Sequence, residues 1–333
     1  MSGPISPPDF IEPETSDSDS AFGDTNSTTY TESLRSSFLQ SVRENGRGYH
    51  KYSDGRYFIP EDEQEQERLD MQHEICLITM DRKLYLSPLP AEVQNVLDIG
   101  TGTGIWAIDF ADQHPISSVI GTDLSPIQPS WIPPNCKFEI DDYEQPWTFS
   151  QNFDFIHGRM LAGSIGDADA LFKQAYDRLT PGGWFELQDF LFPVRADDGT
   201  MDGTPFETLN SKMLEALSLI GRDGRLADRF KKVMIDNGFE NVAEVRYKWP
   251  QNGWPKDKHL KSIGLWNMVN TLDGLHGFAA RLCIQVLGMS PEELEVLLAG
   301  CRKNIQNNKI HGYWTIVVAY GQKPLHPAET TAK

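Results

Sequence analysis

The chain has 333 residues, of which 39% are hydrophobic and 23% are charged, and its formal net charge is −18. This acidity argues against nucleic acid as a direct partner, because phosphate binding needs clustered Lys and Arg. No apolar run reaches the roughly 20 residues of a membrane-spanning helix, and no basic-then-apolar leader opens the chain. We therefore expect a globular protein of the cytoplasm or nucleus, without a membrane partner.

The four cysteines are widely separated and form no Cys-x-x-Cys pair: Cys76, Cys136, Cys283 and Cys301. Zinc sites and disulfide frameworks usually show close or regularly paired spacings. The sequence accordingly predicts reduced thiols and no bound metal.

The first 90 residues of the chain divide into two parts. Residues 1–30 are rich in Ser, Thr, Pro and acidic residues, and they bury too little apolar surface to offset the entropy of ordering. We predict a disordered tail here, followed by an N-terminal helical cap over 31–90. An aromatic connector in this cap ends at Pro60: Tyr49, Tyr52, Tyr57 and Phe58.

One long helix is expected in the cap, over 61–84. Acidic residues occupy its first turns, and Arg82 and Lys83 lie near its end, which suits the helix dipole. Helical spacing places three polar residues on or near one side of it: Arg68, Gln72 and His73.

The central motif follows a short apolar strand over 96–99. Gly100, Gly102 and Gly104 alternate with threonines, and an amphipathic helix is expected over 105–113. This is the first βα turn of a doubly wound α/β fold, in which glycines let the backbone pass close to a ligand. We predict a loop that binds a nucleotide-like cofactor through the backbone at Gly100, Thr101, Gly102 and Gly104.

Two cofactor classes fit this loop. Gly102, Gly104 and Ala107 satisfy a dinucleotide fingerprint, and Asp123 follows 19 residues after Gly104. A carboxylate at Asp123 would accept hydrogen bonds from ribose hydroxyls, which nicotinamide cofactors and S-adenosylmethionine (SAM) both carry. These residues alone leave the choice open.

Acidic residues beside the loop favour SAM. Asp98, at the end of the strand, would repel a pyrophosphate but attract the ammonium and sulfonium groups of SAM. Asp142 is expected to accept from the adenine amine, with Asp141 as the alternative because a one-residue slip in the strand exchanges them. Leu124 and Tyr143 are expected to flank the adenosine.

The order of these motifs over 94–190 resembles the class I SAM-dependent methyltransferases. A Pro-Gly-Gly turn at 181–183 joins a helix to a strand, as in that family. Further motifs resemble the fungal LaeA-like, or TAM-domain, group over about residues 49–320: Tyr57 to Pro60, Glu67 to His73, Ile156 to Met160, and Gln188-Asp189.

The resemblance implies SAM as cofactor and a Rossmann-like, seven-stranded sheet whose last strand is antiparallel and lies between the fifth and sixth. It also implies a setting in fungal secondary metabolism, either as a biosynthetic enzyme or as a regulator with velvet-type protein partners. The absence of a basic nuclear-import run mildly disfavours the regulator.

The elements expected around the motif alternate between strands and helices. Further strands are predicted over 119–123, 136–140, 153–157, 184–189, 242–249 and 312–321. Further helices are predicted over 167–178, 204–221 and 225–236, with a short element after Pro126. The resulting SAM-binding core spans 91–249.

A long insertion over 250–311 is expected to precede the final core strand over 312–323 and a tail over 324–333. We predict one helix over about 258–271, a Gly-punctuated segment, and a second helix opened by a capping box at Ser290 and Glu293. This insertion and the segment 49–84 are expected to roof the acceptor pocket together.

Catalytic residues are harder to assign, because methyl transfer from a sulfonium needs a base only when the acceptor must lose a proton. His157, at the end of the fourth strand, could accept that proton or could simply bond the cofactor or backbone. Arg159 and Arg68 are alternatives for holding the cofactor carboxylate. Glu186 is expected to be a satisfied core carboxylate, with Gln188 and Asp189 facing the acceptor.

Four residues of the insertion are candidates for the acceptor pocket, although ordinary core packing is the favoured interpretation of all four: Trp254, Trp266, His276 and Phe278. Together the motifs predict a SAM-dependent methyltransferase acting on a small secondary metabolite. The alternatives are a nuclear regulator acting through protein partners or protein methylation, and a nicotinamide-dependent oxidoreductase.

Overall fold

The computed structural model describes residues 10–14, 41–44, 47–50 and 60–326. Its main sheet has seven strands in the order β5-β4-β3-β6-β7-β9-β8. Their bounds are β3 Asn95–Ile99, β4 Ser118–Asp123, β5 Cys136–Ile140, β6 Phe153–Arg159, β7 Leu179–Arg195, β8 Glu240–Pro250 and β9 Tyr313–Gln322. β9 pairs antiparallel with both β7 and β8, and the other pairs are parallel. The predicted fold class is confirmed, including the last strand between the fifth and sixth.

The strand order reverses between β3 and β6, because the chain first builds outward to β5 and then returns to the other side of β3. Ligands of open α/β sheets bind outside the carboxyl ends of the strands at such a switch point. The Gly-rich loop follows β3 at this edge. The topology therefore places the predicted cofactor loop where a ligand is expected.

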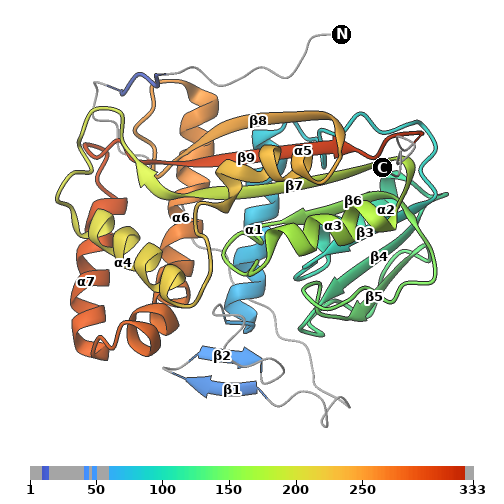
Figure 1. The fold of residues 1–333 in the computed structure, drawn as a ribbon. Coiled ribbons are helices and arrows are strands. Elements are labelled where there is room, and N and C mark those ends of the chain that lie inside the picture. Colours follow the sequence, from blue (N-terminus) through green and yellow to red (C-terminus); the bar gives the residue numbers. More distant parts are fainter. Residues whose placement is uncertain (1–9, 15–40, 45–46, 51–59, 327–333) are drawn as a thin grey trace, which may run out of the picture.

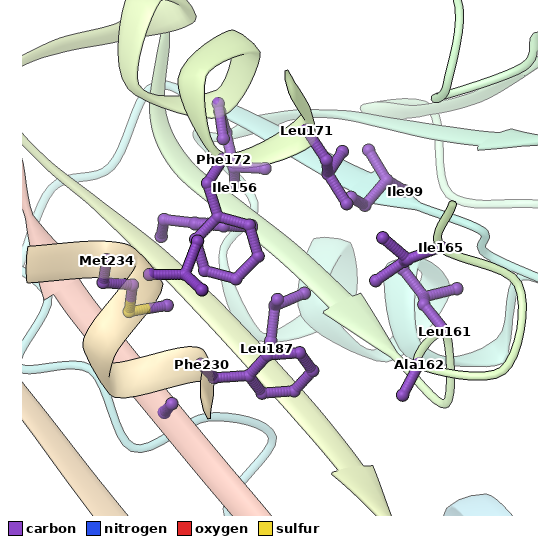
Figure 2. Packing of buried hydrophobic residues seen from close by; sticks show 14 of the residues in the cluster. Ile99, Ile156, Leu161, Ala162, Ile165, Leu171, Phe172, Leu187, Phe230 and Met234 are labelled. Carbon is purple, nitrogen blue, oxygen red and sulfur yellow. The ribbon is translucent and has the colours of Figure 1, made fainter. Parts of the chain in front are cut away.

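Helices cover both faces of the sheet (Figure 1). On one face, α3 (Ala168–Arg178) and α5 (Phe230–Asp236), preceded by the short helix η1 (Leu226–Arg229), pack into the same core as β6 and β7. Figure 2 shows this core, in which Phe172 and Phe230 pack near Ile156 and Leu187. On the other face, α2 (Ile105–Gln113) buries Trp106 and Phe110.

A helical lobe extends beyond the short parallel strands. It contains α4 (Pro205–Leu219), α6 (Lys258–Ala280), the π-helical segment η2 (Arg281–Val286) and α7 (Pro291–Ile305), which share one apolar core with the end of β7. Figure 1 shows these helices gathered beside the long strands β7, β8 and β9. The sequence assigned α4 to the cofactor core, whereas the structure packs it with the insertion. The chain divisions at 91, 250 and 312 stay predictions.

Of the two helices predicted in the insertion, one begins as predicted and the other extends beyond its predicted end. Ser290 and Glu293 form the predicted capping box at the start of α7. α6, however, continues past the expected end at 271 through Gly274 and Gly277. These glycines permit close packing: a Cβ on Gly274 would overlap the Phe278 ring, and one on Gly277 would lie 3.0 Å from Pro60.

The long N-terminal helix, α1 (Glu63–Thr79), is shorter than predicted. Asp62 caps its start by accepting a hydrogen bond from the Glu65 N–H at 3.1 Å. It ends before Asp81 and Arg82, whose φ angles of +52° and +65° are incompatible with a continuing α-helix. Arg82 and Lys83 therefore do not occupy the last helical turn, contrary to the prediction. No short helix forms after Pro126 either, where four prolines fall within nine residues.

The described parts of the N-terminal region also differ from the sequence-based prediction in two places. Residues 10–14 are ordered against the connection between β8 and α6: Ile11 is buried beside Trp254, and the Glu14 N–H donates to the Trp254 carbonyl at 2.8 Å. Burial of Ile11 and two backbone hydrogen bonds, from Glu14 to Trp254 and from Lys256 to Glu12, favour this ordered contact. The predicted helical cap includes a two-stranded hairpin, β1 (Ser41–Glu44) and β2 (Arg47–His50).

The other predictions for this region and for the C-terminus fall partly outside the described residues. These concern the tail over 1–9 and 15–30, the aromatic connector from Tyr52 to Phe58, and the end of the chain from 327. Within the described part of the chain, no helix is both long and apolar enough to cross a bilayer.

Candidate active site

A cavity of about 210 Å³ opens at the carboxyl ends of the central strands. Its first part is bounded by the loops after β3, β4 and β5, and includes several predicted cofactor residues: Gly100, Gly102, Asp123, Leu124, Asp142 and Tyr143. Its second part is bounded by the helical lobe and by α1. The structure thus brings these six predicted cofactor residues together beside a second chamber.

The glycine loop adopts a conformation that L side chains rarely take. Gly100 and Gly102 have φ angles of +62° and +58°, and both line the cavity. α1 packs against the loop: Leu69, which also lines the cavity, would lie 3.6 Å from a Cβ on Gly102, and Thr103 Oγ1 donates to Asp70 Oδ1 at 2.7 Å. The loop therefore presents bare backbone to the cavity and is held in place by α1.

Asp123, at the end of β4, lines the cavity and holds the glycine loop in place. Its Oδ2 accepts from the Gly102 N–H at 2.8 Å, and its Oδ1 accepts from the Ser125 N–H at 3.0 Å. Burial raises the pKa of Asp123 to about 6, and the backbone donors at Ser125 and Gly102 oppose that rise. Remaining lone pairs of this carboxylate can accept the hydroxyls of a ribose.

Asp98 and His157 lie beneath the loop and do not line the described cavity. The His157 Nδ1–H donates to Asp98 Oδ1 at 2.7 Å, and Thr101 Oγ1 donates to Asp98 Oδ2 at 2.5 Å. His157 is fully buried and stacks on Trp106 at a centroid distance of 3.7 Å. In this arrangement the pair supports the loop from below, and the roles of His157 as proton acceptor and of Asp98 as cofactor contact stay predictions.

The other loop residues separate into cavity-facing and supporting groups. Asp142 lines the cavity, whereas Asp141 does not and accepts from the Asp142 N–H at 2.9 Å, which favours Asp142 of the two alternatives. The Thr101 backbone N–H donates to the Thr122 carbonyl at 2.9 Å. A Cβ on Gly104 would overlap the Phe138 ring, so this glycine serves packing at the start of α2. Thr101 and Gly104 thus support the loop and do not line the cavity, and their predicted cofactor contacts stay predictions.

Arg68 and Arg159 both line the cavity, but their surroundings differ. Arg68 is buried, and its Nε and Nη2 donate to the Glu65 carboxylate at 2.6–3.0 Å, while Nη1 donates to Asn270 Oδ1 at 2.7 Å. Its charge is therefore compensated. Arg159 Nη2 donates to His73 Nδ1 at 3.0 Å, and no described carboxylate pairs with it. Arg159 is the better placed of the two for an anionic group.

The second part of the cavity is largely apolar and comes from distant parts of the chain. Its walls are formed by β7, α4, β8, β9, α6 and η2: Phe190, Phe192, Phe206, Leu209, Met213, Leu217, Trp249, Leu275, Phe278, Leu282, Trp314 and Ile316. Side-chain amides and one hydroxyl interrupt this surface: Asn210, Asn267, Asn270 and Thr271. We refer to these sixteen residues as the acceptor chamber.

Most of the chamber was not foreseen from the sequence. Of the four candidates from the insertion, Phe278 lines it, whereas Trp254 is buried elsewhere, Trp266 is 43% exposed, and His276 lies near Glu295. The apolar stripe of the 204–221 helix was the sequence signal that could have indicated the chamber. An amphipathic helix can turn its apolar face toward a cavity as well as toward a core.

Gln188 and Asp189 also lie outside the cavity wall. Gln188 Nε2 donates to the Leu84 carbonyl at 2.9 Å. Asp189 accepts from the Leu161 and Ala162 N–H groups at 2.6 Å each, and burial raises the pKa of Asp189 to about 7. Glu186 accepts from the backbone at Leu86 and is a satisfied core carboxylate, as expected.

Comparison with known proteins agrees with this geometry. A family model described as a methyltransferase domain matches residues 67–244, more than half of the chain. The methyltransferase pytC of Aspergillus terreus is 41% identical over 297 residues, covering 88% of this chain and 91% of that protein. The chain belongs to the LaeA-like class I methyltransferases.

Two further relatives extend the range of this LaeA-like methyltransferase family. The probable methyltransferase tdiE of Emericella nidulans is 38% identical and covers 79% of this chain and 83% of its own length. The secondary metabolism regulator LAE1 of Cochliobolus heterostrophus is 34% identical, and the match covers 84% of this chain and 94% of that protein. The predicted family and the predicted SAM cofactor are confirmed, and the nicotinamide alternative is set aside.

Proposed function

We propose that this LaeA-like methyltransferase transfers the methyl group of SAM to a small, largely apolar acceptor bound in the acceptor chamber. The main observation that supports this proposal is that one cavity joins the glycine loop and Asp123 to that chamber. The chamber surface suits ring systems and alkyl chains, because burying apolar area contributes about 25 cal/mol per Å². Similarity to pytC and tdiE, named as methyltransferases, supports this proposal.

The residues of the first part fit SAM by the chemistry of their side chains. We propose that Asp123 accepts from the ribose hydroxyls, that Asp142 accepts from the adenine amine, and that Leu124 and Tyr143 flank the adenosine. The bare backbone at Gly100 and Gly102 admits the methionine portion, and Arg159 pairs with its carboxylate.

The bound cofactor supplies a methyl group on a sulfonium, and the chain supplies position and exclusion of water. Walls from α1, α4 and α6 restrict the acceptor to the mouth of the glycine loop. Alignment of the reacting atoms at about 3 Å contributes much of the rate of such a reaction. The described residues of the chamber carry no carboxylate, imidazole or amine, so we propose that acceptors react without a base from the chamber.

A calorimetric titration with SAM, with NADH as the control, tests the cofactor site. We expect micromolar binding of SAM and none of NADH, because the carboxylate of Asp98 beneath the glycine loop would repel a pyrophosphate bound there. Methylated products would then be sought by incubating the protein and SAM with apolar metabolite extracts. Tighter binding of NADH than of SAM would contradict the proposal.

Replacing Thr271 with Trp tests the chamber. Thr271 lines the cavity and makes only a long hydrogen bond, 3.4 Å from Asn267, so the replacement removes little and fills space. We expect SAM affinity within about twofold of wild type and methyl transfer reduced at least about tenfold. Val269→Trp on the exposed side of α6 is the matched control and should leave both unchanged. Equal activity of the two variants would place the acceptor elsewhere.

The relative LAE1 favours a second candidate, in which the chain regulates secondary metabolism through a protein partner or by protein methylation. Labelled SAM distinguishes the two candidates: label recovered in small organic products supports the first, and label recovered only in protein supports the second. A nuclear location of the tagged full chain would further favour the regulator, and a cytoplasmic one the metabolic enzyme.

A further inference from the structure

His73 lies between a cation and an anion in a connected chain of three side chains. On one side, Arg159 Nη2 donates to His73 Nδ1 at 3.0 Å. On the other side, His73 Nε2 contacts Asp109 Oδ2 at 2.9 Å. A histidine that accepts at Nδ1 must carry its proton at Nε2, so the Nε2–H donates to Asp109. The imidazole is therefore neutral in this arrangement.

Burial supports the neutral form. His73 is 3% exposed, and desolvation lowers the pKa of its imidazole, with Arg159 adding to that effect and Asp109 and Asp70 opposing it. Protonation would put a second cation against the guanidinium and remove the acceptor at Nδ1. The three residues come from three elements: His73 from α1, Asp109 from α2, and Arg159, which alone of the three lines the cavity, from β6.

The neutral ring has a specific consequence for Arg159. A guanidinium beside a carboxylate forms a bidentate ion pair and loses its attraction for a third group. His73 keeps Asp109 and Arg159 apart while still giving Arg159 a hydrogen-bond acceptor. The guanidinium is thereby held in place in the cavity wall without being neutralised by Asp109.

We propose that His73, fixed by Asp109, is a positioning residue that holds Arg159 ready for the carboxylate of the cofactor's amino-acid end. This rests on the proposed SAM site. Without the ring, the Arg159 guanidinium loses the acceptor that orients its Nη2, and the Asp109 carboxylate loses the donor that separates it from that cation. Removing His73 thus weakens recognition of the carboxylate while leaving recognition of the adenosine, by Asp123 and Asp142, intact.

Two ligands that differ at the amino-acid end test this proposal. S-adenosylhomocysteine carries the carboxylate, whereas 5′-methylthioadenosine keeps the adenosine and the thioether but lacks the amino-acid end. For His73→Ala we expect binding of S-adenosylhomocysteine to weaken about tenfold, with binding of methylthioadenosine within about twofold of wild type. His73→Gln keeps one acceptor and one donor and should restore S-adenosylhomocysteine binding to within about threefold.

His114→Ala is the matched control, because His114 lies at the end of α2, stacked on Phe110 and outside the cavity wall. It should leave the ratio of the two affinities unchanged. Equal weakening of both ligands in His73→Ala, or failure of His73→Gln to restore binding, would overturn the positioning role. If wild-type protein bound neither ligand, the proposed cofactor site itself would be wrong, which separates the two failures.

Discussion

Asp123→Asn is expected to weaken SAM binding between about 10-fold and 100-fold while the protein stays folded. Hydrogen bonds to a charged group contribute about 1.5–3 kcal/mol, which corresponds to that range. Asparagine keeps one oxygen, so it can still accept from Gly102 or Ser125 and hold the loop. Calorimetry with SAM, together with circular dichroism to verify the fold, measures the effect.

The pH dependence of binding provides the control for this prediction. The pKa of Asp123 is raised to about 6, so the carboxylate is protonated as pH falls through 6 and loses an acceptor for ribose hydroxyls. Wild-type affinity should then fall by up to about tenfold per pH unit below 6. Asp189, with its pKa near 7, titrates in both proteins, so the difference between the two profiles isolates Asp123. Parallel profiles would remove the ribose assignment.

Breaking the buried pair of Glu65 and Arg68 is expected to produce the largest loss of stability. Their side chains are 2% and 3% exposed, and Arg68 also donates to Asn270 and lies 4.8 Å over the Phe278 ring. Removing one partner leaves an uncompensated buried charge, which costs about 3–5 kcal/mol. Arg68→Met and Glu65→Ala should each lower the free energy of unfolding by this amount in denaturant titrations.

A double variant distinguishes the ion pair from the packing around it. Glu65→Leu with Arg68→Met removes both charges and should cost less than the sum of the single changes, because no charge stays buried alone. If Arg68→Met instead left stability within about 1 kcal/mol and abolished SAM binding, Arg68 would be the cofactor ligand that the sequence offered as an alternative to Arg159.

The sequence by itself determined the cofactor half of this protein. Gly100 and Gly102 need positive φ angles, and Asp123 follows the next strand, so local spacing alone brings them to one edge of a doubly wound sheet. The strand and helix periods also predicted the order of elements along the chain, with α2 at its observed bounds, whereas the place of the last strand in the sheet came from the family resemblance. Short-range patterns carry this information, because each residue's role depends on neighbours within a single βα unit.

Only the tertiary structure decided which charged residues face the cavity. His157 and Asp98 have the residue types of catalytic groups, yet pairing across β3 and β6 turns them toward each other beneath the loop. Arg68 and Arg159 were equivalent in the sequence. Glu65, one helical turn before Arg68, neutralises the first, whereas a neutral His73 faces the second.

The acceptor chamber likewise required the fold. Its walls come from β7, α4, β8, α6 and β9, elements separated by more than a hundred residues from first to last. Periodicity identifies the apolar face of α4 or α6, but an apolar face packs equally well against a core or around a cavity. Whether a cavity remains between such faces depends on the packing of the long strands against the helices. No local sequence pattern contains that packing.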